Sequence, residues 1–203
     1  MSRIKRITNK LYEFAPTVTD KLTAQRFFQQ ACEAEEEQKS NDALELYHRA
    51  LSYDGSLAMA WVNVGTIHFH CREFIRAEEC YRKALEIDPK YLLACSNLAN
   101  VLNEQGRLKE AVEYYYGAIA IDPQFQDAHY NLALVYRGIG EGRKALQHFR
   151  LYLRCRNGGD DVWASEARRN IRQLSKTIDM RIIRKDPTSV IATSQKPPII
   201  VEQ

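Results

Sequence analysis

The sequence contains no long hydrophobic run. No window approaches the roughly 18 apolar residues that a membrane-spanning helix needs, and no apolar stretch near the N-terminus resembles a secretory signal. Neither sign of charge dominates, because 29 Lys and Arg stand against 26 Asp and Glu, giving a net charge of +3. The overall charge therefore gives no indication of a nucleic-acid partner. We expect a cytoplasmic protein with no transmembrane segment and no nucleic-acid ligand.

The sequence also lacks the motifs of common enzymes and metal sites. Its five cysteines are an odd number, are scattered and form no Cys-x-x-Cys pair, so we expect reduced thiols. His68 and His70 flank Phe69 and would point to different faces of a helix, which makes them a poor metal pair. No GxxxxGK[ST], GxGxxG or GxSxG motif occurs. We therefore predict no enzymatic activity, no cofactor and no metal site.

The dominant feature that is present is a repeat of 34 residues. It divides the chain into units at 24–57, 58–91, 92–125 and 126–159, and fixed periods of this length are typical of helical solenoids. A small residue and an aromatic residue recur in every unit: Ala43, Ala77, Ala111 and Ala145, followed by Tyr47, Tyr81, Tyr115 and Phe149. We expect the small residue to let two helices approach closely and the aromatic ring to fill the space between helix pairs.

Each unit reads as two helices joined by a short turn. In the third unit we expect helices over about 93–104 and 108–121, with Gly106 in the turn and Asp122-Pro123 closing the second helix. Residues 160–177 predict a cap helix, and the tail 178–203 is expected to be disordered. Residues 1–23 form a mildly basic lead-in that could contain a short helix. Such a helix would either touch a membrane surface or a partner, or pack loosely on the first unit.

The second unit matches the tetratricopeptide repeat (TPR) pattern residue by residue, through Trp61, Gly65, Ala77, Tyr81, Ala84 and Pro89. The third and fourth units repeat most of these positions, so the chain resembles the TPR family over about residues 24–177. The resemblance implies an all-α, right-handed TPR solenoid of about four helix-turn-helix repeats with a C-terminal cap helix. It also implies a concave groove, lined by the first helix of each pair, that holds a peptide.

Three asparagines, Asn63, Asn97 and Asn131, occupy the same place in successive units. A carboxamide offers both a donor and an acceptor, so it suits the backbone of an extended peptide whatever its side chains. The ladder is similar to the one in the TPR superhelix of O-linked N-acetylglucosamine transferases, although no catalytic domain is present. The alternative is that these asparagines hydrogen-bond neighbouring repeats or a helix carbonyl.

Other residues share the asparagine face by helical spacing. The predicted peptide-binding set is Asn63, Asn97, Asn131, Thr66, Asn100, Tyr130, Arg137, Met59 and Leu93. Leu93 and Asn97 stand where carboxylate-clamp TPR domains use lysine and arginine, so such a clamp is not expected.

These patterns favour a non-catalytic adaptor that binds a protein or peptide as an extended segment in the concave groove. Two alternatives stay open. One is a structural subunit or homo-oligomer that uses the cap helix and tails, and the other is a regulatory accessory subunit of an enzyme.

Overall fold

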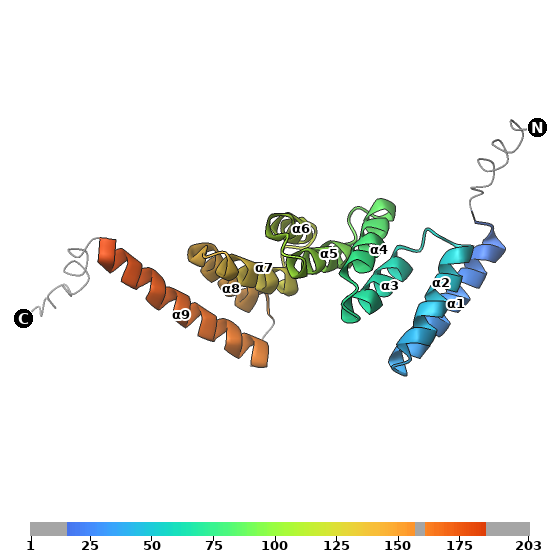
Figure 1. Cartoon of the computed structure of the whole chain (residues 1–203), viewed down its shortest axis with the longest axis horizontal. Coiled ribbons are helices and arrows are strands. Elements are labelled where there is room, and N and C mark those ends of the chain that lie inside the picture. The colour runs from blue at the N-terminus through green and yellow to red at the C-terminus, as the bar shows by residue number, and fades with distance from the viewer. Residues whose placement is uncertain (1–15, 157–160, 186–203) are drawn as a thin grey trace, which may run out of the picture. The chain divides into compact units, whose positions relative to one another are not determined.

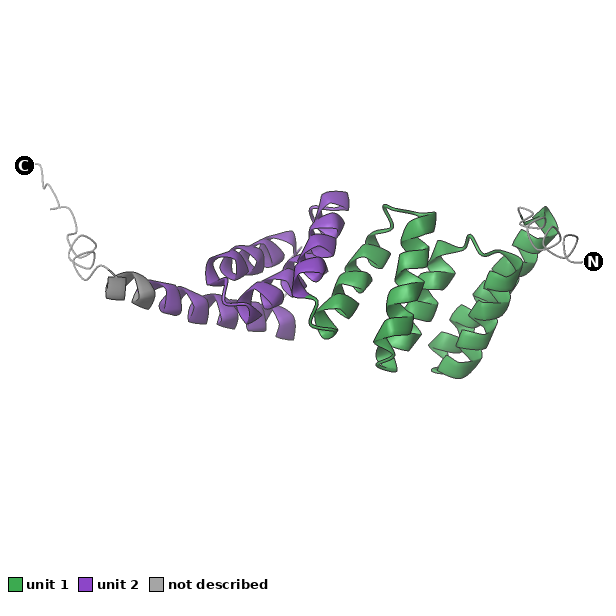
Figure 2. Cartoon of the chain, turned by 45° about the horizontal axis from the view of Figure 1, so that its top comes forward, with its two compact units in different colours: residues 1–107 green, residues 108–203 purple. Residues whose placement is uncertain are grey.

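The computed structural model describes residues 16–156 and 161–185. Within these ranges the chain forms nine helices and no strand (Figure 1), which confirms the predicted all-α TPR solenoid. Residues 1–15 of the predicted lead-in and most of the predicted disordered tail lie outside the described residues. The chain divides into two compact units, residues 1–107 and 108–203 (Figure 2).

Unit 1 contains five described helices: α1 (Val18–Glu36), α2 (Ser40–Tyr53), α3 (Ala58–His70), α4 (Phe74–Ile87) and α5 (Leu92–Glu104). Helix α1 packs against α2, and α3 packs against α4. Each pair then meets the next helix in the chain, through contacts of α2 with α3 and of α4 with α5. Helices α3 and α5 also touch, so the first helices of the second and third repeats are neighbours within this unit.

Unit 2 contains four described helices: α6 (Leu108–Ile121), α7 (Gln126–Gly138), α8 (Gly142–Cys155) and α9 (Val162–Lys185). Helix α7 packs against α6 and α8, and α8 packs against α9. The predicted cap helix therefore lies on the fourth repeat, as the orange helix of Figure 1 shows.

The recurring alanine and aromatic positions form the core of both units. All four alanines are fully buried, and the four rings at the aromatic place are at most 1% exposed. Gly65 is a further position that requires a small residue, because a Cβ built on it would lie 2.8 Å from the ring of Tyr81. Close helix approach around a buried ring is thus what the repeat pattern encodes.

Two backbone devices recur with the repeat and set the turns. The second residue after each first helix takes a left-handed conformation: Gly106 and Gly140 with φ of 76° and 82°, and Gln38 and Arg72 with φ of 61°. In the turns between repeats, the carboxylates of Asp54, Asp88 and Asp122 each accept the backbone N–H two residues later, at 2.8–2.9 Å. This turn explains why Asp54-Gly55 and Asp88-Pro89 can stand at the same place.

Two predicted boundaries differ from the structure. Helix α1 begins at Val18, inside the predicted lead-in 1–23, because Thr17 and Asp20 form a reciprocal capping box at its start. Helix α9 continues to Lys185, eight residues beyond the predicted end. Ile178, which belongs to the predicted tail 178–203, lies close to Gly142 of α8 and extends the buried side of the helix. None of the described helices is both long and apolar enough to cross a bilayer.

Candidate functional site

In unit 1, the predicted binding residues lie on the neighbouring first helices α3 and α5. We call this the inner-helix surface and define it by Met59, Asn63 and Thr66 of α3 with Leu93, Asn97 and Asn100 of α5. Met59 is 53% exposed and Leu93 is 47% exposed, whereas the four polar members are half-buried. The surface therefore presents two apolar side chains to solvent beside recessed amide and hydroxyl groups.

Asn63 makes a contact with the preceding repeat. Its amide Nδ2 donates a 2.8 Å hydrogen bond to the hydroxyl of Tyr47 on α2. That hydroxyl in turn donates to the carboxylate of Glu35. Burial, followed by the contacts with Cys32 and Glu35, raises the pKa of Tyr47 well above its usual range, so the ring stays neutral. At this asparagine the donor is used between repeats, as the alternative interpretation of the ladder describes.

Thr66 is also engaged inside the unit. Its hydroxyl donates to the Val62 carbonyl at 3.0 Å and lies 3.1 Å from the hydroxyl of Tyr81. Burial raises the pKa of Tyr81 to about 12. Thr66 thus fixes the inward end of a core ring.

Asn97 differs from Asn63. Its half-buried side chain makes no hydrogen bond to any residue in 16–156 or 161–185, and it stands one helical turn from the exposed Leu93. Within unit 1 it is the ladder residue whose donor and acceptor are both available to a ligand.

In unit 2, two predicted site residues line a pocket of about 330 Å³. Tyr130 and Asn131 of α7 contribute to it together with residues outside the predicted binding set. We call it the cap pocket, and its described walls are Gln126, Asp127, Tyr130, Asn131, Tyr152, Arg156, Asp161 and Trp163. Tyr130 is 8% exposed, and its ring centroid lies 5.0 Å from that of Tyr152 and 5.6 Å from that of Trp163.

Arg137 is exposed, but its guanidinium forms a hydrogen bond within the chain. Its guanidinium donates to Oδ1 of Asn170 on α9, and Asn170 is 1% exposed. The amide nitrogen of Asn170 donates to the Glu166 carbonyl at 3.0 Å. This side chain therefore ties α9 to α7, a role that depends on where α9 packs and that helical spacing did not predict.

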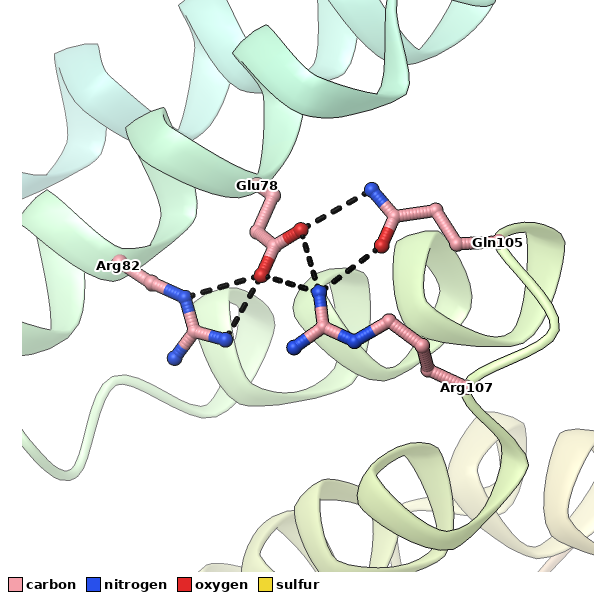
Figure 3. A network of polar contacts seen from close by, with 4 residues as sticks. All are labelled: Glu78, Arg82, Gln105 and Arg107. Carbon is pink, nitrogen blue, oxygen red and sulfur yellow. Dashed lines mark hydrogen bonds and ion pairs between the residues drawn. The ribbon is translucent and has the colours of Figure 1, made fainter.

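A second pocket, of about 670 Å³, lies in unit 1 and was not predicted from the sequence; we call it the Glu78 pocket. One side is built around Glu78 of α4, whose carboxylate accepts hydrogen bonds from Arg82, Gln105 and Arg107 at 2.7–3.1 Å (Figure 3). Burial raises the pKa of Glu78, but these hydrogen bonds outweigh it and the net pKa is lowered. The network joins α4 to the end of α5, and Ile75 lies 73% exposed at the pocket.

No cluster of three or more His, Cys, Asp or Glu side chains that could hold a metal ion occurs in the described part of the chain. The five cysteines are free thiols. His68 is buried and its Nδ1 lies 2.6 Å from a carboxylate oxygen of Glu73, so it is a packed side chain.

Paired helices with a 34-residue period, buried small and aromatic positions and left-handed turns define a tetratricopeptide-repeat protein. A family model matches residues 27–154, and the chain belongs to that family, described as the cilia and flagella-associated protein 70 middle TPR-like domain. No curated protein matches the chain.

Solved structures show the same fold at low identity. The chain is similar to Pseudomonas aeruginosa pilF, at 20% identity and a TM-score of 0.68 over 89% of this chain and 80% of that one. It is similar to a mutant of Thermobaculum terrenum O-GlcNAc transferase, at 21% identity and a TM-score of 0.63 over 68% of this chain and 27% of that one. It is also similar to the first TPR of Spaghetti (RPAP3) bound to an HSP90 peptide, at 18% and 0.57 over 59% and 95%.

Proposed function

We propose that this chain is a non-catalytic adaptor that binds an extended segment of a partner protein along the first helices of its repeats. TPR proteins generally mediate protein–protein interaction, and this assignment supports the general class. The observation that carries the finer proposal is the exposure of Met59 and Leu93 on touching helices, beside the available amide of Asn97.

The chemistry of this surface suits an extended peptide with apolar side chains. Exposed apolar area gains from being removed from water, at about 25 cal/mol per Å². A carboxamide next to that area can bond the N–H and C=O groups that an extended backbone presents. Apolar contacts would thus supply binding energy, and Asn97 would hold the backbone in register.

The test is a selection from a phage-displayed library of random linear peptides, followed by affinity measurement on purified variants. The double variant Met59→Ser/Leu93→Ser should weaken binding of the selected peptides at least about tenfold, because two buried apolar contacts are lost. The matched control is Ile75→Ser/Ile87→Ser, which removes two exposed apolar side chains from α4 instead.

Equal helicity and equal melting temperature of the variants are required before affinities are compared. Loss of binding only in the α4 control would place the interaction at the Glu78 pocket and contradict the proposal. If neither double variant changes the affinity, the alternative of an assembly subunit that uses α9 and the tails is favoured.

A further inference from the structure

The repeat register places Asp127 where the second and third repeats have Met59 and Leu93. All three side chains are exposed on the first turn of the first helix of their repeat. The fourth repeat thus replaces an exposed apolar side chain by a carboxylate. This carboxylate stands at the cap pocket of unit 2, next to the ladder residue Asn131.

The other charges of the cap pocket compensate each other. Arg156 pairs with Asp161 at 3.0 Å and donates to the hydroxyl of Tyr152 at 2.9 Å. Asp161 also caps α9, because its carboxylate accepts the N–H of Ala164 at 2.8 Å. Asp127, by contrast, makes no ion pair or hydrogen bond through its side chain within the described part of the chain. Among its described walls, the pocket therefore has one carboxylate in excess.

The cap pocket also has aromatic walls, of which Trp163 is exposed and Tyr130 is buried. Trp163 is 60% exposed, and its ring stands at 84° to that of Tyr130 with centroids 5.6 Å apart. An indole face attracts a cation through its quadrupole. The chain already contains such a pair in unit 1, where the ammonium of Lys83 lies 4.1 Å from the centroid of Trp61.

We propose that the cap pocket binds the lysine or arginine side chain of the partner segment, with Asp127 pairing its charge and Trp163 covering its stem. This inference rests on the proposed function, since it names the side-chain class of the partner segment that the first helix of the fourth repeat selects. A volume of about 330 Å³ lies at the small end of organic-ligand pockets, roughly 300–1,000 Å³, which suits one long side chain. An acidic side chain would meet the carboxylate of Asp127 and is disfavoured.

The experiment uses blocked amino acids, because they test the pocket without an extended backbone. The probes are Nα-acetyl-lysine N-methylamide, which keeps its charged side chain, and its arginine counterpart. They are titrated into the full chain, and binding is followed by NMR at the indole N–H signal of Trp163. This signal is assigned by its loss in the variant Trp163→Phe. The norleucine analogue, which has no charge, is the ligand control. We expect saturable shifts with the two basic probes and a response at least about threefold weaker with norleucine.

The protein control compares two exposed first-turn acids. Asp127→Asn should weaken the basic probes about three- to tenfold, whereas Asp42→Asn on α2 should leave them unchanged. Equal response to norleucine, an unchanged affinity in Asp127→Asn, or no shift at Trp163 would each overturn the proposal. Selected peptides that bind the inner-helix surface but show no dependence on a basic residue would overturn this inference alone. Probe binding without any selected peptide would overturn only the proposed function.

Discussion

At the residue scale, two glycines of this chain carry opposite meanings. A Cβ at Gly65 would meet the buried ring of Tyr81 at 2.8 Å, and that ring is 1% exposed. A Cβ at Gly117, inside α6, would meet no atom within 4 Å. The first glycine serves close packing, and the second only lowers helix propensity.

We predict that Gly65→Ala lowers the free energy of unfolding by about 1–3 kcal/mol, because the Tyr81 ring has to shift in a filled core. Gly117→Ala should raise it by about 0.5–1 kcal/mol, because alanine favours the helix. Urea titration followed by circular dichroism measures both. A stabilising Gly65→Ala would show that the approach of α3 to α4 is not as close as described.

The residue pattern also shows how far the sequence could predict the structure. The core positions such as Ala77 and Tyr81 followed from the period and from residue size, since each recurs at the same place in every repeat. Whether Asn63 bonds a ligand or a neighbouring repeat stayed open, because the bond to Tyr47 depends on the distance between two repeats. For the same reason the role of Arg137 was missed: its partner Asn170 lies on a helix whose position the spacing does not fix.

At the element scale, a chain of polar contacts joins α6, α7 and α8. His129 lies with Nε2 3.2 Å from the Pro123 carbonyl and Nδ1 3.1 Å from Nδ1 of His148, whose Nε2 lies 3.3 Å from the Tyr116 hydroxyl. A carbonyl only accepts, so neutral His129 donates from Nε2 and accepts at Nδ1, and His148 donates to it. Tyr116 then donates to His148 and lies 3.2 Å from the hydroxyl of Tyr136.

The contacts of His148 make the stability of unit 2 depend on pH. Burial, and then the neighbouring His129, lower the pKa of His148 from 6.5 to about 4. As pH falls, His148 therefore takes up its proton in the unfolded chain before it does so in the folded chain. The contribution of His148 to the free energy of unfolding is complete above about pH 6.5 and is lost between about pH 6.5 and 4. Lys144, whose ammonium lies 5.2 Å from the centroid of the Tyr136 ring, adds positive charge nearby.

We predict that the free energy of unfolding falls by up to about 1.4 kcal/mol per pH unit within this window. The first repeat has Leu46 at the place of His148. In the variant His148→Leu, the dependence of the free energy of unfolding on pH should therefore be markedly weaker. Urea titrations at a series of pH values compare the two proteins. Identical slopes for wild type and variant would exclude His148 as the source.

The extent of the elements was predictable only in part. The start of α1 had a readable signal, because Thr17 and Asp20 have the spacing of a capping box. The length of α9 had a weaker one, since Ile171, Leu174 and Ile178 continue a helical spacing into a stretch that composition alone assigns to a tail. The walls of the cap pocket come from α7, α8 and α9 and from Arg156 and Asp161 between α8 and α9, so only the structure could bring them together.

At the scale of the whole molecule, both units present the first-helix face of a repeat, with different chemistry. Unit 1 exposes the apolar side chains Met59 and Leu93, and unit 2 exposes Asp127 beside aromatic rings. The two asparagines of unit 1 also differ, because Asn63 bonds a neighbouring repeat and Asn97 bonds no described residue. The proposed adaptor would therefore use Asn97 for the ligand and Asn63 for the fold.

The most direct test of this account is the affinity of a library-selected peptide for Asn97→Ala, measured by calorimetry beside the melting temperatures of Asn97→Ala and Asn63→Ala. One or two lost backbone hydrogen bonds, at about 0.5–1.5 kcal/mol each, predict that Asn97→Ala binds at least about twofold more weakly while it melts like the wild type. Asn63→Ala should instead melt at a lower temperature. An unchanged affinity in Asn97→Ala, or a lowered melting temperature that accounts for its loss of binding, would contradict the account.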